Sequence, residues 1–215
     1  MMMMVMMMHS TLLLLPILAA GNPIEPRACT TVSPTFVRSV DILTPAYIPV
    51  ADGTTAVYKD SHAPDPKDRY YGHIEDTVVE FSGIPSNAQD CEFQLFFEKG
   101  FHDIIAYYEP VKIDVWNVDQ SAPSNSSTIS WNNAPKPVGL FGVLEDLELP
   151  RGVNLRGYPA YDHDVLRNVN SSNCKETMTF RVSISSSLEK GGVQFRQRDQ
   201  KVGPVGGWRM VYNCS

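Results

Sequence analysis

The sequence contains little clustered positive charge. Its 18 Lys and Arg residues are outnumbered by 24 Asp and Glu residues, which gives a formal net charge of −6. No run or stripe of basic residues stands out along the chain. Proteins that bind nucleic acids neutralise phosphates with clustered Lys and Arg, so the composition argues against a nucleic-acid partner.

The motifs of common catalytic and metal sites are missing as well. The sequence has no G-x-S-x-G turn, no C-x-x-C, and no histidine pair spaced H-x-H, H-x-x-x-H or H-E-x-x-H. A copper site of the histidine-brace type needs His at the mature amino terminus, where Asn22 or Ala28 would stand. We therefore expect no metal, no cofactor and no catalytic residue.

Two clusters of polar residues remain, and each is weak evidence for a catalytic or metal site. Asp162-His163-Asp164 offers mixed metal ligands, but neighbouring residues of an extended chain point to opposite faces. Glu145, Asp146 and Glu148 form the densest acidic group, whereas glycoside hydrolysis needs two carboxylates across a cleft. We interpret both clusters as solvated surface.

Two other classes of function stay open. A glycoside or ester hydrolase whose site is assembled across the fold would show two facing carboxylates in a cleft, or a serine close to His73, His102 or His163. A structural protein of a wall or matrix would carry glycans and have no pocket.

Only the amino terminus has a long apolar run. Residues 1–20 lack Lys and Arg, pass through an apolar stretch and end in small residues, as a cleavable secretory signal does. An uncleaved membrane anchor is the alternative, but Pro16 and the small-residue ending favour cleavage. We expect a secreted protein, extracellular or in the cell wall, with no membrane span in the mature chain.

Residues 21–28 are interpreted as a Pro-rich spacer or propeptide. Arg27 is a candidate processing site for a kexin-like protease, and a plain disordered tail is the other interpretation. The remaining chain, 29–215, is expected to form one domain.

Short alternating segments recur along that domain, and no segment has the periodicity of a long amphipathic helix. The clearest stretch is 77–99, where two segments with one apolar face each flank the turn around Gly83 and Pro85. Such faces need a second layer to cover them. Further strands are expected at 36–43 (an edge strand), 111–116, 138–144 (a buried strand), 178–184, 193–196 and 208–214.

These segments predict an all-β fold, a two-sheet antiparallel β-sandwich of the jelly-roll-like kind. Irregular connections are expected at 145–149 and 151–173, and the segment 101–109 fits either a helical turn or a short strand.

The four cysteines are disulfide candidates, because a secreted chain matures in an oxidising compartment. Three pairings are possible. We favour Cys29–Cys91 and Cys174–Cys214, since each pair joins a cysteine of a connection to one on a strand.

Two acceptor sequons, at Asn125 and Asn170, lie in predicted loops, so both are candidate glycosylation sites. A third, at Asn213, stands beside a predicted disulfide and is not expected to be used.

Three short motifs resemble a known family. They are Phe81-Ser82-Gly83-Ile84-Pro85, the segment from Cys91 to Leu95, and the terminal G-W-R-M-V-Y-N-C of residues 207–214. They are similar to the secreted fungal ubiquitin-3-binding-protein C-terminal domain family, over nearly all of the mature chain. The resemblance implies a β-sandwich of undefined activity. The ubiquitin-like machinery in the family's name is cytosolic and nuclear, so we do not expect it as a partner of a secreted chain.

Exposed aromatic side chains would suit a binding role. Trp116, on the polar side of its strand, and Trp131, at a strand end, are candidates for a ligand platform. The pairs Tyr70-Tyr71 and Tyr107-Tyr108 would each place one ring on either side of an extended chain. We therefore expect a non-catalytic protein that binds an unknown extracellular protein or glycan, with a carbohydrate-binding module as the specific alternative.

Overall fold

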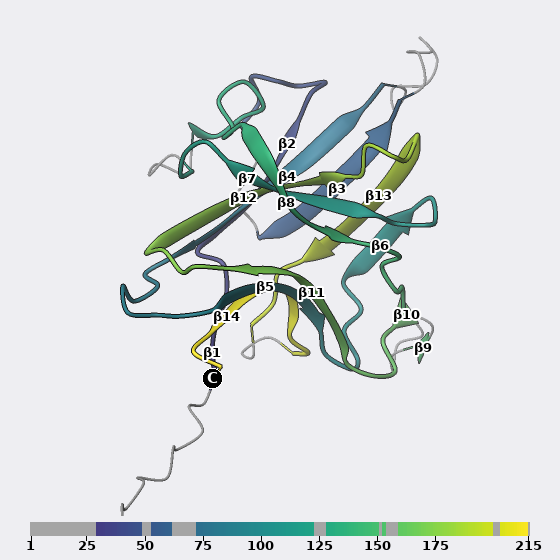
Figure 1. The fold of residues 1–215 in the computed structure, drawn as a ribbon. Coiled ribbons are helices and arrows are strands. Elements are labelled where there is room, and N and C mark those ends of the chain that lie inside the picture. Colours follow the sequence, from purple (N-terminus) through teal and green to yellow (C-terminus); the bar gives the residue numbers. More distant parts are fainter. Residues whose placement is uncertain are drawn as a thin grey trace, which may run out of the picture.

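The computed structural model describes residues 29–48, 53–61, 72–122, 128–150, 152–153, 159–199 and 203–214. Nearly all regular structure in them is strand, and two antiparallel sheets pack face to face (Figure 1). The predicted all-β sandwich is confirmed. The expected signal and spacer segments, 1–20 and 21–28, lie outside the described residues.

The larger sheet has eight strands, and β2 pairs with β4 beside the main order. Along the sheet the strands are β6 (Ile104–Tyr107), β13 (Lys190–Arg196), β3 (Thr54–Asp60), β4 (Ile74–Ser82), β12 (Thr177–Ile184), β7 (Ile113–Val118) and β8 (Pro137–Leu144), with β2 at Phe36–Asp41.

The smaller sheet has four strands in the order β1-β14-β5-β11. Their bounds are β1 (Thr30–Val32), β14 (Gly206–Tyr212), β5 (Cys91–Phe97) and β11 (Val165–Ser172). A separate two-stranded pair joins β9 (Gly152–Val153) to β10 (Pro159–Ala160). Within the described residues, no helix is long and apolar enough to cross a membrane.

The segment 77–99 supplies one strand to each layer, β4 to the larger sheet and β5 to the smaller one. The turn between them begins at Gly83, whose φ of 75° favours glycine. The inward side chains meet as predicted: the Phe93 ring stacks on Phe180 with centroids 4.6 Å apart and lies 5.1 Å from Trp208. All three side chains are buried, so this cluster joins the two sheets.

Two predictions about strands are wrong. The segment 151–173 is not irregular throughout, because its end forms the eight-residue strand β11. Strand β8 is not buried, because it is an edge of the larger sheet and leaves Val138 65% and Leu140 52% exposed. Strand β3 was not predicted at all, and the ambiguous segment 101–109 contains the short strand β6.

The predicted disulfide pairing is also wrong, since the bonds are Cys29–Cys214 and Cys91–Cys174. Strand β1 pairs with β14 so that Thr30 faces Tyr212, which brings the neighbouring Cys29 beside Cys214. Strand β11 pairs with β5 so that Ser172 faces Cys91, and Cys174 follows two residues later. Strand register in the smaller sheet therefore decides both pairs.

Candidate functional site

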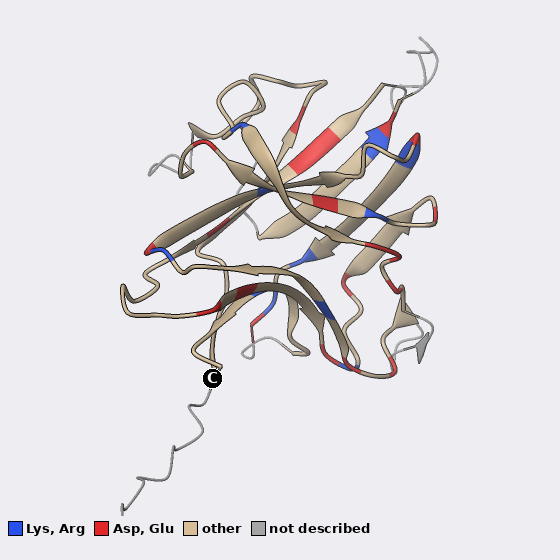
Figure 2. Ribbon diagram, viewed as in Figure 1, with Lys and Arg blue, Asp and Glu red and all other residues tan. Residues whose placement is uncertain are grey.

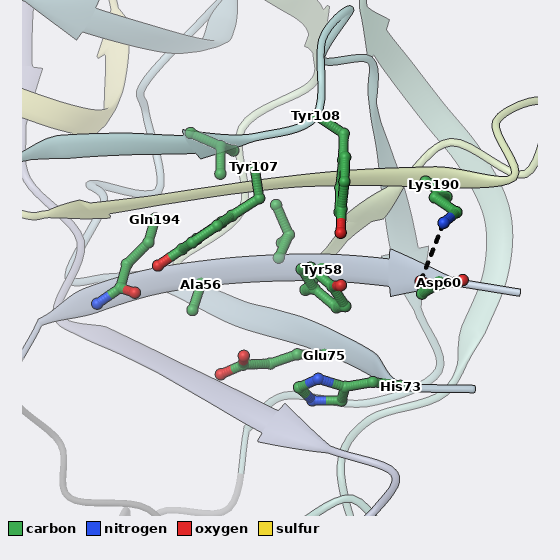
Figure 3. Close-up of a pocket in the computed structure, with 11 residues that line it drawn as sticks. Ala56, Tyr58, Asp60, His73, Glu75, Tyr107, Tyr108, Lys190 and Gln194 are labelled. Atoms are coloured by element: carbon green, nitrogen blue, oxygen red, sulfur yellow. Dashed lines mark ion pairs between the residues drawn. The ribbon is translucent and has the colours of Figure 1, made fainter. Parts of the chain in front are cut away.

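A groove of about 680 Å³ lies where strands β3, β4, β6 and β13 of the larger sheet meet (Figure 3). Its lining is rich in aromatic and charged side chains. They are Tyr58, Asp60, His73, Glu75, Tyr107, Tyr108, Lys190 and Gln194, with Ala56, Val57 and Val193 beside them.

Gly192 of β13 lies between two of the tyrosines that line this groove. The register places it opposite Tyr58 of β3 on one side and opposite Tyr107 of β6 on the other. A Cβ atom at this position would lie 2.7 Å from Tyr58 Cδ2 and 3.2 Å from Tyr107 Cβ. Because glycine has no side chain, the two tyrosine rings can approach each other across β13, with centroids 6.1 Å apart and edge to face.

Tyr108 brings a third ring into the groove. The sequence predicts that Tyr107 and Tyr108 point to opposite sides, but both line the groove (Figure 3). The reason is that the strand ends at Tyr107 and Tyr108 takes a φ of 64°, which breaks the alternation. This backbone conformation is uncommon for a bulky residue and marks a turn after the strand. Tyr107 and Tyr108 are 41% and 53% exposed, so a ligand can reach both rings.

The ammonium group of Lys190 lies over the ring of Tyr108. Lys190 Nζ lies 5.5 Å from the centroid of the Tyr108 ring and 3.7 Å from Asp60 Oδ2. Asp60 is 3% exposed, so its pairing with Lys190 offsets part of the cost of burying a carboxylate. Figure 3 shows this pair at the end of the groove beside Tyr108.

Glu75 supplies a second carboxyl group on the β4 side. Burial raises the pKa of Glu75 to about 7, a hydrogen bond with Ser39 opposes this rise, and the negative charges of Asp41 and Asp76 add to it. The register places Glu75 opposite Tyr58, while His73 lies with its ring 5.0 Å from the Tyr58 ring. His73 Nε2 is also 3.1 Å from Asp41 Oδ1.

The two tryptophans predicted as a platform lie outside this groove. Trp116 is half-buried on β7 and its Nε1–H donates to Ser183 Oγ at 3.1 Å. Trp131 packs on a small cluster of buried side chains, and the Arg181 guanidinium lies 4.5 Å above its ring. Arg181 is itself held by Asp76, with Nε 2.7 Å from Oδ2. The contacts of Trp131 are therefore those of a packed residue.

The polar clusters noticed in the sequence form ion pairs. His163 lies 2.6 Å from Asp162 and 3.3 Å from Glu148, and Glu145 pairs with Lys112 at 2.7 Å. Among the described residues, no group of three or more His, Cys, Asp or Glu side chains could hold a metal ion. In the part of the chain that Figure 2 colours, basic residues are scattered over separate strands without a continuous stripe.

Of several further positions singled out in the sequence, one lies on a strand and the others lie outside the described residues. Asn170 lies on strand β11 and not in a loop, and its Nδ2 donates to Phe141 O at 2.6 Å. Asn125, His62 and the pair Tyr70-Tyr71 lie outside the described residues.

Sequence reasoning missed most of the groove. Tyr58, Asp60, Glu75, Lys190 and Gln194 have no motif in common, and they come from three strands that pair over long distances in the chain. The tyrosine pair 107–108 was the one available indication. No protein-family model matches this chain, and no curated protein has a significant match to it.

Proposed function

We propose that this protein is a secreted, non-catalytic binding protein whose groove between β3, β4, β6 and β13 takes carbohydrate. The observation that carries the proposal is the convergence of three tyrosine rings, with Tyr107 and Tyr108 both beside Tyr58 and polar side chains in the same lining. Small-molecule sites typically combine an aromatic lining with a few convergent polar groups.

The chemistry of the lining suits a sugar ring. A sugar offers C–H faces that pack on aromatic rings and hydroxyl groups that need hydrogen-bond partners. Tyr58, Tyr107 and Tyr108 offer both a ring and a hydroxyl. Gln194 and Glu75 add an exposed amide and a carboxyl group that can donate and accept.

Secretion rests on the cysteines and on the leader sequence. Both disulfides fit an oxidising compartment, and the apolar residues 1–20 fit a cleavable signal. We further propose membership of the ubiquitin-3-binding-protein C-terminal domain family. The β-sandwich is the fold that this resemblance implies.

Alanine at Tyr107 should weaken glycan binding about fivefold, because one stacked ring contributes on the order of 1 kcal/mol. A glycan-array screen of the oxidised protein identifies the ligand, and calorimetry then compares the variants. Trp116→Ala is the matched control, since Trp116 is an aromatic residue outside the groove.

If Trp116→Ala lost binding while Tyr107→Ala bound fully, the glycan site would lie on β7. That result would contradict the assignment of the binding site to the groove. A blank array from folded protein would reject the carbohydrate proposal and direct the search to protein partners.

Gly192→Ala should also weaken binding, by roughly tenfold, without removing any ligand-contacting group. The added methyl group would overlap Tyr58 Cδ2 at 2.7 Å, so one ring must move. The measurement is the same calorimetric titration, together with thermal unfolding to show that the variant is folded. Gly139→Ala is the control, because a Cβ there has no neighbour within 4 Å. Equal affinity of Gly192→Ala and wild type would show that the ring arrangement is not needed.

The position of Glu75 favours a second candidate function, a glycoside hydrolase with this residue as general acid. A carboxyl with a pKa near neutrality in a cleft is the usual property of such an acid, and Asp60 is a second carboxyl in the same lining. The Glu75→Gln variant separates the two functions. A hydrolase would lose turnover of the glycan found on the array, whereas a binding protein shows no turnover in either form.

A further inference from the structure

The arrangement of charges in the groove indicates what kind of sugar it takes, an inference that rests on the proposed carbohydrate function. Lys190 shows that the groove accommodates an ammonium group, because Nζ lies against the Tyr108 ring and close to Asp60. Tyrosine rings attract cations through their negative faces. The groove therefore has the components of an ammonium site at its Tyr108 end, where the chain's own lysine occupies it.

Among the described residues that line the groove, Lys190 is the one Lys or Arg, and the carboxyl group of Glu75 lies at the end away from it. The charges that act on Glu75 are those of Asp41 and Asp76, and both are negative. The Arg181 guanidinium is directed to Asp76, with Nε 2.7 Å from Oδ2. An ammonium group brought by a ligand would be attracted by Glu75 and by the face of the adjacent Tyr58 ring.

We infer that the groove recognises glycans carrying a free amine, with the sugar ring packed on Tyr58 and the ammonium group directed to Glu75. The chemical class is an amino sugar without its N-acetyl group. Acidic sugars should bind less well at this end of the groove, because a second anion would lie beside Glu75.

The charged groups around Glu75 set the direction of the pH dependence. They are Asp41 of β2, His73 and Asp76 of the β4 segment, Asp60 of β3, Lys190 of β13 and Arg181 of β12. Ionisation of Glu75 as the pH rises through neutrality creates the charge that attracts an amine. Affinity for the amine form should therefore rise from pH 5 to pH 6.5, a range in which the ligand amine stays mostly charged while Glu75 begins to ionise.

The experiment is calorimetric titration of a glucosamine tetramer and of its fully N-acetylated counterpart. At pH 6.5, where most of the ligand amines carry a charge, wild type should bind the free-amine tetramer about tenfold more tightly, the effect of one charge-assisted contact. Glu75→Gln should bring the two affinities to within about threefold by weakening only the amine form. Glu176→Gln, a substitution at an exposed glutamate, should leave the wild-type preference unchanged.

The possible results test the amine inference and the carbohydrate proposal separately. Equal or tighter binding of the N-acetylated tetramer by wild type overturns the amine inference and leaves the carbohydrate proposal standing. A preference that persists in Glu75→Gln overturns the role of Glu75. If neither tetramer binds and the array is blank as well, both the inference and the proposed function fail.

Discussion

Replacing Cys91 and Cys174 together with alanine should lower the free energy of unfolding by roughly 4 kcal/mol. The bond closes a loop of 83 residues, and cross-linking a loop of this length restricts the unfolded chain by about that amount. Urea unfolding at neutral pH, followed by tryptophan fluorescence, measures the change. The midpoint should fall while the slope of the transition rises modestly, because the freed chain exposes more surface.

The location of the bond adds a structural consequence. Strand β11 is an edge of the smaller sheet and pairs only with β5, so Cys174 fixes its end to Cys91. Hydrogen exchange in β11 should therefore accelerate more than in β14, the other partner of β5. Uniform acceleration across the smaller sheet would contradict this local role.

The connectivity itself is open to a direct check. Proteolysis of unreduced protein should release one linked pair of peptides containing Cys91 with Cys174 and another containing Cys29 with Cys214. A peptide joining Cys29 to Cys91 would contradict the arrangement of the smaller sheet, because β1 pairs with β14 and not with β5.

The two-layer architecture was predictable because the alternation of apolar and polar residues within each strand shows locally which face is buried. Phe93, Leu95 and Phe97 all turn inward and are fully buried, as their spacing predicts. Strand pairing was not predictable, because it depends on residues far apart in the chain. Strand β11 has Leu166 exposed and a register shift between Asn168 and Asn170, so its sequence does not show the alternation of a half-buried strand.

The groove could not be predicted from the sequence, because its residues also come together through long-range strand pairing. Gly192, Tyr58 and Tyr107 come together only once β13 has paired with β3 and β6. Tyr108 joins them because its positive φ overrides the alternation that a strand would impose. A glycine in a strand indicates a close approach, but the residues that approach it are known only from the fold.

Substituting Glu75 with Gln should stabilise the protein at pH 8 by about 3 kcal/mol and leave it nearly unchanged at pH 4. Burial is the main cause that raises the pKa of Glu75 to about 7 from an ordinary value of 4.5. Below pH 4.5 the carboxyl is protonated in the folded and the unfolded chain, so it adds no difference. Between pH 4.5 and about 7 the carboxyl is ionised in the unfolded chain but still protonated in the folded one, so the folded state loses about 1.4 kcal/mol of stability for each pH unit.

Glutamine has nearly the same shape and no charge, so it removes this loss while keeping a polar group beside Ser39. The measurement is urea unfolding of both proteins between pH 4 and pH 8, with Glu176→Gln as an exposed control. The curves of wild type and Glu75→Gln should separate between pH 4.5 and 7, and the control should follow wild type throughout. If the stability curves of wild type and Glu75→Gln stayed parallel over this pH range, ionisation of Glu75 would not lower the free energy of unfolding. The groove would then lack the destabilised carboxylate on which its preference for amines depends.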